Sequence, residues 1–386
     1  MTLATQANPA QSHSAQQAVF SALCSQDQNL DLDSVIKRTL KPSVIAIDHG
    51  EYPDQVLREI GAAGAYRHHI GAHLAQGNDY IDIIAAIDDM ARISKECMST
   101  GFMTWCQDAM AWYVANSDNE HLKQTVLPKL ASGELLGGTA LSNPMKYFAG
   151  IEDILLHATE TDDGFIVNGN LPWISNLGEN HVFGSIFRVS GEQPRDIMAL
   201  VSTETPGLTL KQLAEFTGME GTGTYALFFE DVFIPKTDIL ADPVGPFIQK
   251  IKAGFVLLQT GMAAGVIESC IELCEDVEPR LGHVNRFLDD RPDELREALA
   301  DAKALIEQLA QDVYNPDPTY FREVLELRLA GSELALRAAN SAMLHTGANG
   351  YLVDAPAQRK LREAYFVAIV TPAIKHLRKE INGLIE

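Results

Sequence analysis

The spacing of hydrophobic and polar residues divides the chain into three blocks. Residues 29–136 and 242–386 repeat apolar positions at helical intervals. Residues 137–241 instead gather glycine, threonine and β-branched residues into short strand-like runs. We therefore predict an α+β fold: an N-terminal α-helical domain, a central β-domain and a C-terminal domain of the four-helix type. Residues 1–28 begin with a polar stretch, so we expect a flexible N-terminal segment there.

The middle block has the clearest turn signals. Residues 154–169 read as two strands separated by the polar turn at 162–164, and residues 223–235 as another strand. The pair Asn168-Gly169 is typical of a tight turn, so we place one there. Upstream, residues 117–120 have the capping-box pattern, which predicts Ser117 as the N-cap of a helix that ends near residue 133.

Residues 254–275 have almost no polar face. A helix of this kind is buried, either within its own chain or against another. We interpret this helix as one that needs a partner to cover it, and we expect a homodimer or homotetramer. Residues 292–313 have an ordinary amphipathic spacing and need no such cover.

The formal net charge of −22 limits the possible partners. It repels phosphate backbones and anionic lipids, so we expect no nucleic-acid partner and no membrane insertion. The five cysteines are an odd number, which indicates reduced thiols in a reducing compartment and a cytoplasmic protein. Cys270 and Cys274 lie one helical turn apart, but we interpret them as core residues and predict no metal site.

Four separated motifs carry a resemblance to a known family. They are HLKQTVLPKLASGELLGGTALSNP at 121–144, NGNLPWIS at 168–175, GM at 218–219 with FEDV at 229–232, and GANGY at 347–351 with LREA at 361–364. Their order and spacing resemble those of the acyl-CoA dehydrogenase superfamily over residues 30–386. The resemblance implies a central β-barrel domain between two helical domains, a flavoprotein oxidoreductase activity, and FAD in preference to FMN.

A flavin needs a flat apolar wall and hydrogen-bond donors at its edges. The resemblance assigns the wall to Trp173, a hydroxyl near N5 to Ser175, and the pyrimidine end to the segment that contains Thr139. It also implies that a glycine turn contacts the FAD pyrophosphate of a neighbouring subunit and that Arg286 holds the adenosine half. The expected cofactor-binding residues are Thr139, Leu141, Ser142, Trp173, Ile174, Ser175, Arg286, Gly347, Ala348 and Gly350.

The chain departs from the family pattern where a catalytic base is expected. Acyl-CoA dehydrogenases remove an α-proton with a buried carboxylate, and the resemblance places that position at Thr371. The alternative position on the first long C-terminal helix holds Phe255 and Val256. Either the base has moved or the reaction needs none. The candidates for a relocated base are Glu152, Asp153 and Glu220, each of which also reads as an ordinary surface carboxylate.

Three functions stay open at this point. The first is FAD-dependent dehydrogenation of a CH–CH bond in an acyl thioester or similar activated substrate, carried by coenzyme A or by a carrier protein. The second is flavin-dependent monooxygenation, which the missing base favours. The third is a non-catalytic flavin-binding partner subunit. The first two also imply an electron-transfer or flavin-reductase partner.

Overall fold

The N-terminal part of the chain is a bundle of helices around the buried helix α6. The computed structural model describes residues 31–74, 81–191 and 193–385, so the segment predicted to be flexible, residues 1–28, lies outside the described residues. The helices of this part are α2 (Leu32–Val35), η1 (Ile36–Leu40), α3 (Lys41–Asp48), α4 (Asp54–Ala62), η2 (Ala65–His73), α5 (Ile83–Glu96), α6 (Met98–Asn116), α7 (Glu120–Thr125) and α8 (Leu127–Ser132).

The prediction that Ser117 caps a helix is wrong. The N-cap of α7 is Asn119, whose side chain accepts a hydrogen bond from the Leu122 amide. The Ser117 hydroxyl instead donates to the Leu240 carbonyl at 2.6 Å, so it ties the helical domain to the end of the sheet. The same hydroxyl accepts from the Asn119 amide at 3.1 Å, so its local bond lies just before the helix and not within its first turn.

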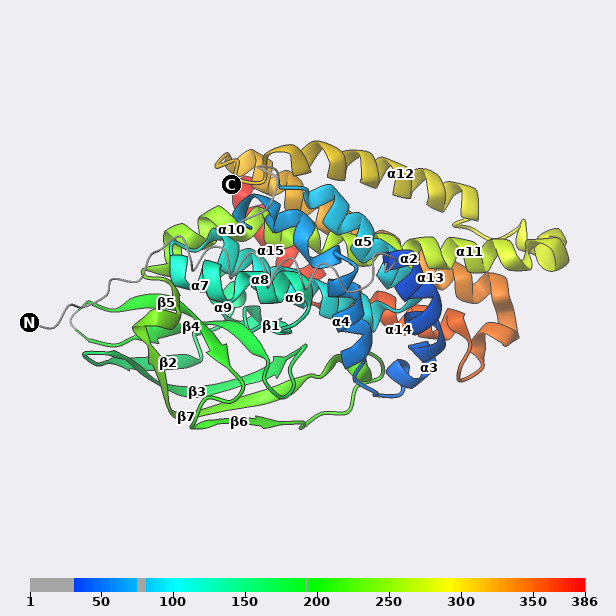
Figure 1. Ribbon diagram of the computed structural model, residues 1–386. Coiled ribbons are helices and arrows are strands. Elements are labelled where there is room, and N and C mark those ends of the chain that lie inside the picture. Colours follow the sequence, from blue (N-terminus) through cyan, green and yellow to red (C-terminus); the bar gives the residue numbers. More distant parts are fainter. Residues whose placement is uncertain (1–30, 75–80, 192, 386) are drawn as a thin grey trace, which may run out of the picture.

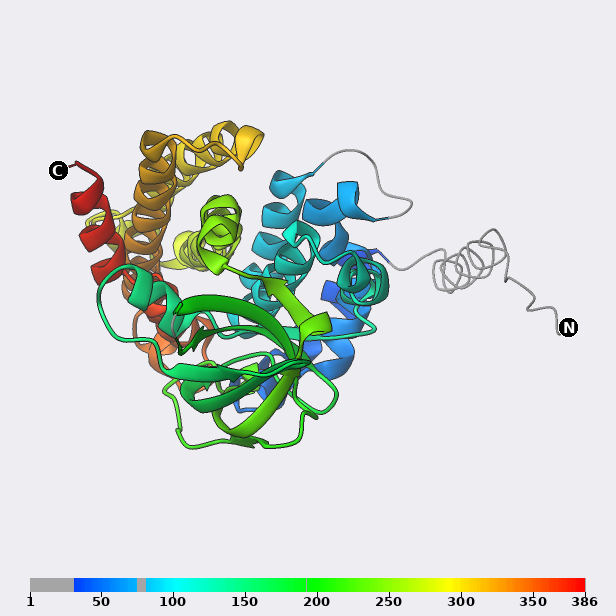
Figure 2. The same ribbon diagram turned by 90° about the vertical axis from the view of Figure 1, so that its left-hand side faces the viewer.

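The central block folds into one sheet that curls beneath the helices (Figure 2). Within the described residues it has eight strands in the order β6-β7-β3-β2-β4-β5-β8, and β1 pairs with β4 in parallel. The elements of this block are β1 (Gly137–Thr139), α9 (Ser142–Phe148), β2 (Leu156–Glu160), β3 (Gly164–Ile174), β4 (Val182–Val189), β5 (Arg195–Ser202), β6 (Leu208–Lys211), η3 (Glu220–Thr222), β7 (Tyr225–Pro235), η4 (Lys236–Asp238) and β8 (Ile239–Ala241).

The predicted turn at Asn168-Gly169 is also wrong, because both residues lie inside β3. The pairing of β3 with β7 shifts register between Val167 and Gly169, so this site is an irregularity within a long strand. Gly169 has a φ of +134°, and a Cβ there would lie 2.3 Å from the Leu155 carbonyl oxygen. Glycine is needed for this bulge-like step and not for a hairpin.

The C-terminal part packs its helices around a long apolar pair. The elements are α10 (Val244–Leu258), α11 (Thr260–Asn285), α12 (Pro292–Leu309), η5 (Ala310–Asp312), α13 (Pro318–Thr346), η6 (Gly347–Tyr351), α14 (Pro356–Ile369) and α15 (Ile374–Ile385). Figure 2 shows α10 and α11 in the middle, with the N-terminal helices on one side and α12 and α13 on the other. This arrangement of helical, β and helical parts confirms the predicted fold class.

The apolar segment 254–275 does not need a second chain to cover it. The stretch from Val244 to Asn285 is long and apolar enough to cross a membrane by composition, but 89% of its most apolar window is buried inside the protein. This burial is typical of a core helix in a globular protein. The prediction that this helix needs a partner to cover it is therefore wrong, because other parts of the same chain cover it.

Candidate functional site

The ends of β1 and β3 bring the first group of predicted cofactor residues together. A Cβ at Gly138 would lie 2.5 Å from the Ser175 carbonyl oxygen, so the two chain segments are in direct contact. The Asn176 side-chain amide donates to the Gly137 carbonyl at 2.7 Å and fixes this approach. Thr139 and Ser175, which are 36 positions apart in the sequence, therefore lie on adjacent segments.

Hydroxyl groups surround these strand ends. The Ser175 hydroxyl is 2.6 Å from that of Thr224, and the Thr139 hydroxyl is 2.7 Å from the phenol of Tyr113. Burial raises the pKa of Tyr113 well above its usual value, so this phenol stays protonated and available as a donor. The site thus offers neutral donors and acceptors, which suit the polar edge of a flavin ring.

Trp173 gives the site its apolar surface. Its side chain is 60% exposed, although it lies at the end of a strand whose neighbours Leu171 and Ile174 are buried. Ser175 follows two residues later and is partly exposed, so an aromatic face and a hydroxyl lie within one short segment. The residues present therefore fit a flat aromatic group such as a flavin, stacked on Trp173.

Thr371 lies directly opposite Ser142. The two hydroxyl oxygens are 3.0 Å apart, and they join the N-terminus of α9 to the loop after α14. The resemblance placed Ser142 at the cofactor and Thr371 at the position of the base, and the structure brings the two side chains into contact. A pair of hydroxyls can donate and accept hydrogen bonds, but it cannot remove an α-proton near neutral pH.

Two residues outside the motifs, Gln259 and Arg328, hydrogen-bond to the backbone of the Thr371 loop and of the helix end before it. The Gln259 side-chain amide donates to the Thr371 carbonyl at 2.9 Å. The Nε of Arg328 donates to the Gln259 side-chain oxygen at 2.8 Å, and its Nη2 donates to the Val367 carbonyl at 2.8 Å. A signal for both was present in the sequence, because Gln259 and Arg328 are polar residues on otherwise apolar helix faces.

An aromatic cluster fills the space between α6, α10 and α14 near this loop. The rings of Trp105 and Phe255 are 5.0 Å apart, and those of Phe102 and Phe366 are 4.6 Å apart. Phe102 stacks on Trp105 at 5.8 Å, which joins the two pairs. Phe255, at the alternative base position, is thus a core residue in this cluster and carries no acid–base function.

Two of the three candidate carboxylates have other partners. Glu152 accepts from the Asn143 side chain at 2.9 Å and pairs with Lys146, and both Glu152 and Asp153 are exposed. Glu220 accepts a hydrogen bond from the Phe216 amide within its own loop. These contacts engage Glu152 and Glu220, whereas Asp153 is exposed to solvent.

The second group of predicted cofactor residues lies elsewhere in the chain. Arg286 caps the end of α11, where its guanidinium lies 4.8 Å from the ring centre of Phe287. Gly347, Ala348 and Gly350 form η6 at the end of α13, and the Asn285 side chain joins the two helix ends through the His345 carbonyl at 3.2 Å. In Figure 1 these ends lie far from the sheet. The structure therefore separates the predicted residues into two groups.

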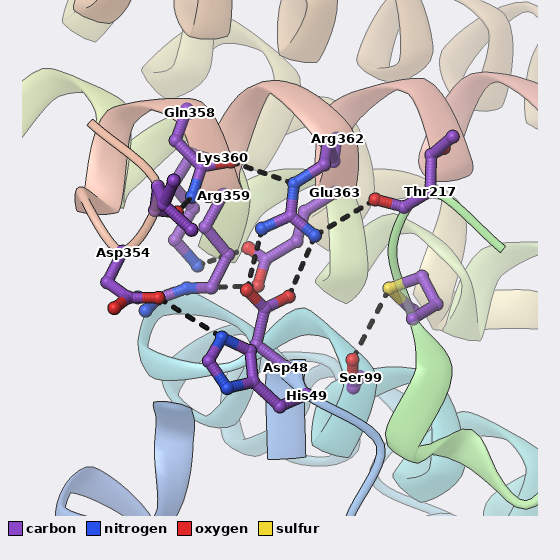
Figure 3. A network of polar contacts seen from close by, with 12 residues as sticks. Asp48, His49, Ser99, Thr217, Asp354, Gln358, Arg359, Lys360, Arg362 and Glu363 are labelled. Atoms are coloured by element: carbon purple, nitrogen blue, oxygen red, sulfur yellow. Dashed lines mark hydrogen bonds and ion pairs between the residues drawn. The ribbon is translucent and has the colours of Figure 1, made fainter. Parts of the chain in front are cut away.

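Polar contacts fix α14 against the N-terminal helices (Figure 3). Arg362 forms a bidentate ion pair with Asp48 and donates to the Thr217 carbonyl. Glu363 is 2.6 Å from the buried ammonium of Lys360 and accepts from the Met98 amide at 3.3 Å. The LREA motif is thus a structural clamp that positions the helix whose end leads to Thr371.

Comparisons with known proteins agree with this architecture. Residues 31–134 match the family model "Acyl-CoA dehydrogenase, N-terminal domain". A probable acyl-CoA dehydrogenase of Bacillus subtilis, YngJ, is 25% identical over 356 residues, which covers 86% of this chain and 90% of the relative. The human mitochondrial short-chain specific acyl-CoA dehydrogenase is 27% identical, with 86% and 82% covered.

A solved structure shows the same fold along the whole chain. Butyryl-CoA dehydrogenase from Megasphaera elsdenii superposes with a TM-score of 0.79 at 18% identity and covers 99% of this chain and 100% of its own. At 18% identity this similarity shows the fold alone.

Proposed function

We propose that this chain, which is similar to acyl-CoA dehydrogenases over most of its length, is an FAD-dependent oxidoreductase whose cofactor lies against Trp173. The observation that supports this is the exposed Trp173 ring, two residues from Ser175, whose hydroxyl meets that of Thr224 where β3 ends. When bound, FAD supplies two-electron redox chemistry that side chains lack. In this proposal Trp173 stacks on the ring, while Ser175 and the Thr139–Ser142 segment hydrogen-bond to its edges.

The substrate that we propose first is an acyl thioester or a similarly activated small molecule, with oxidation at a CH–CH bond. The hydroxyls of Ser142 and Thr371 would orient its carbonyl group by hydrogen bonding. An electron-transfer partner in the cytoplasm would then reoxidise the cofactor.

Flavin binding is the first test. Purified protein is expected to be yellow, or to bind added FAD with micromolar affinity or better, about −8 kcal/mol. Trp173→Ala should weaken binding by about 1–3 kcal/mol, the usual contribution of a stacked aromatic ring. Trp173→Phe is the matched control and should retain most of the affinity. Colourless protein that ignores both FAD and FMN in a titration would overturn the proposal.

Flavin-dependent monooxygenation is the second candidate, and the Ser142–Thr371 pair favours it. A hydroxyl pair without a carboxylate suits a reaction that begins with no α-proton removal. Its test is anaerobic reduction followed by mixing with oxygen in the presence of a substrate. Oxygen incorporated into product would favour this candidate, and a flavoprotein that neither oxidises nor oxygenates any substrate would favour a non-catalytic partner subunit.

We further propose that the protein assembles as a homodimer or homotetramer through the surface where α11 and α13 end. Large apolar side chains are exposed there, among them Phe287 (77%), Tyr351 (82%) and Val353 (81%). Exposed apolar groups of this size mark association surfaces. Light scattering is expected to give a multiple of 42.2 kDa, with Tyr351→Ser shifting the mass downward. A clean monomer at micromolar concentration would exclude this surface as an interface.

A further inference from the structure

The buried guanidinium of Arg328 has no charged partner in the described part of the chain. Arg328 lies on α13, and its side chain is completely buried. Its hydrogen bonds go to three neutral acceptors: the Gln259 side chain, the Ser332 hydroxyl and the Val367 carbonyl. Burial lowers the pKa of Arg328 to about 10, so the group is still charged at neutral pH. A buried charge is unfavourable unless an opposite charge compensates it.

The orientation of Gln259 follows from this neighbour. A guanidinium can only donate hydrogen bonds, so the side-chain oxygen of Gln259 must face Arg328. Its NH2 group then faces the Thr371 carbonyl, and this bond is strengthened because the amide is polarised by the cation. A chain of hydrogen bonds, which we call the relay, runs from Arg328 through Gln259 to the Thr371 carbonyl. It connects the interior of the helical bundle to the residue whose hydroxyl meets Ser142.

The charge near residue 371 has the opposite sign to the one that the family pattern leads us to expect. A catalytic glutamate would place a negative charge at residue 371, whereas this chain has a neutral hydroxyl with a cation behind it. The protein interior screens charge poorly, so the positive potential of Arg328 extends past Gln259 to Thr371. Of the two hydroxyls, one donates to the other, so a second O–H remains free to donate to a ligand.

We propose that Arg328, acting through Gln259, is a specificity-determining positioning residue that makes this site select a substrate carrying a carboxylate or similar anionic group beside Thr371. The inference rests on the proposed flavoprotein function and adds the substrate class to it. Arg328 does not touch the ligand: it holds the Thr371 loop in place and sets the positive potential at the free hydroxyl.

Matched pairs of small ligands test this in the flavin-containing protein. Butyrate and butyramide, and benzoate and benzamide, differ in charge but hardly in shape, and each is titrated while the flavin absorption spectrum is followed. The wild type is expected to bind each carboxylate at least about tenfold more tightly than its amide, a difference of about 1.4 kcal/mol. In Arg328→Met the ratio should fall to near one, and in Arg328→Lys most of it should remain.

A purely structural role for Arg328 would lower the melting temperature of the variants but leave the carboxylate-to-amide ratio unchanged, and that result overturns the inference. If Arg328→Met does not fold, Arg328→Gln provides the same test, because it removes the cation and keeps a side chain that can donate hydrogen bonds. An undiminished ratio in Arg328→Gln would also overturn the inference. Flavin content is measured first: protein without flavin defeats the proposed function, whereas a flavoprotein that binds both ligands of a pair equally defeats only this inference.

Discussion

Ordinary acyl-CoA thioesters are expected to bleach the flavin of the wild-type protein very slowly, if at all. Removal of an α-proton needs a positioned carboxylate, and general-base catalysis contributes about 10²–10⁴-fold to such a step. Here Thr371 stands at the expected position, bonded to Ser142, and Phe255 at the alternative position is buried among aromatic rings. The measurement is stopped-flow flavin absorbance under anaerobic conditions with butyryl-, octanoyl- and palmitoyl-CoA.

Thr371→Glu is the informative variant, because it supplies a carboxylate at the end of α14. If the pocket accepts a thioester, its bleaching rate should exceed that of the wild type by up to about 10²-fold, the lower part of the range for a general base. Thr371→Gln has the same size without the base and should not accelerate bleaching. Rapid bleaching of the wild type would instead show that a relocated base exists, with Glu152, Asp153 and Glu220 the first residues to mutate.

Glu363→Ala is expected to destabilise the protein by about 3–5 kcal/mol, the usual result of removing one partner from a buried ion pair. Glu363 is 3% exposed, Lys360 is fully buried and Arg359 is 9% exposed, so the variant leaves buried cations without their carboxylate. The Met98 amide loses its acceptor as well. The midpoint of urea unfolding, followed by circular dichroism, measures the effect.

Two control variants separate charge from shape at this clamp. Glu363→Gln keeps an acceptor for the Met98 amide and should cost less than the alanine variant. The double variant Lys360→Met with Glu363→Met replaces the pair by apolar groups of similar length, and such replacements are often neutral or stabilising. Equal unfolding midpoints for the wild type and Glu363→Ala would show that the ion pair contributes nothing to stability.

The sequence alone determined the fold class, because hydrophobic spacing and composition depend on which secondary structure each block forms. The strand run that ends at Pro235 is β7, and the amphipathic stretch that begins at Pro292 is α12. The ordered motifs also indicated the similarity to acyl-CoA dehydrogenases that the comparisons found. Local signals were less reliable: Asn119 and not Ser117 caps α7, Ser117 donates to the distant Leu240 carbonyl, and Gly169 lies at a strand irregularity.

Only some residues of the candidate site could be predicted from the sequence. Trp173, Ser175 and Ser142 could be named because each lies in a motif, but nothing local joins Ser142 to Thr371, which follows it by 229 positions. Gln259 and Arg328 belong to no motif, and their hydrogen bonds join the residue between α10 and α11 to α13 and to the loop after α14.

Only the tertiary structure decided what covers the apolar helices and what charge lies behind Thr371. A run of apolar residues states that a helix must be buried, but whether its own chain or a partner buries it depends on long-range packing. In the same way, the sequence around an arginine does not specify which distant groups form hydrogen bonds or ion pairs with it. Because the energy of a charge depends on its surroundings in three dimensions, the absence of a carboxylate beside Arg328 in the described structure emerged only once the helices were packed.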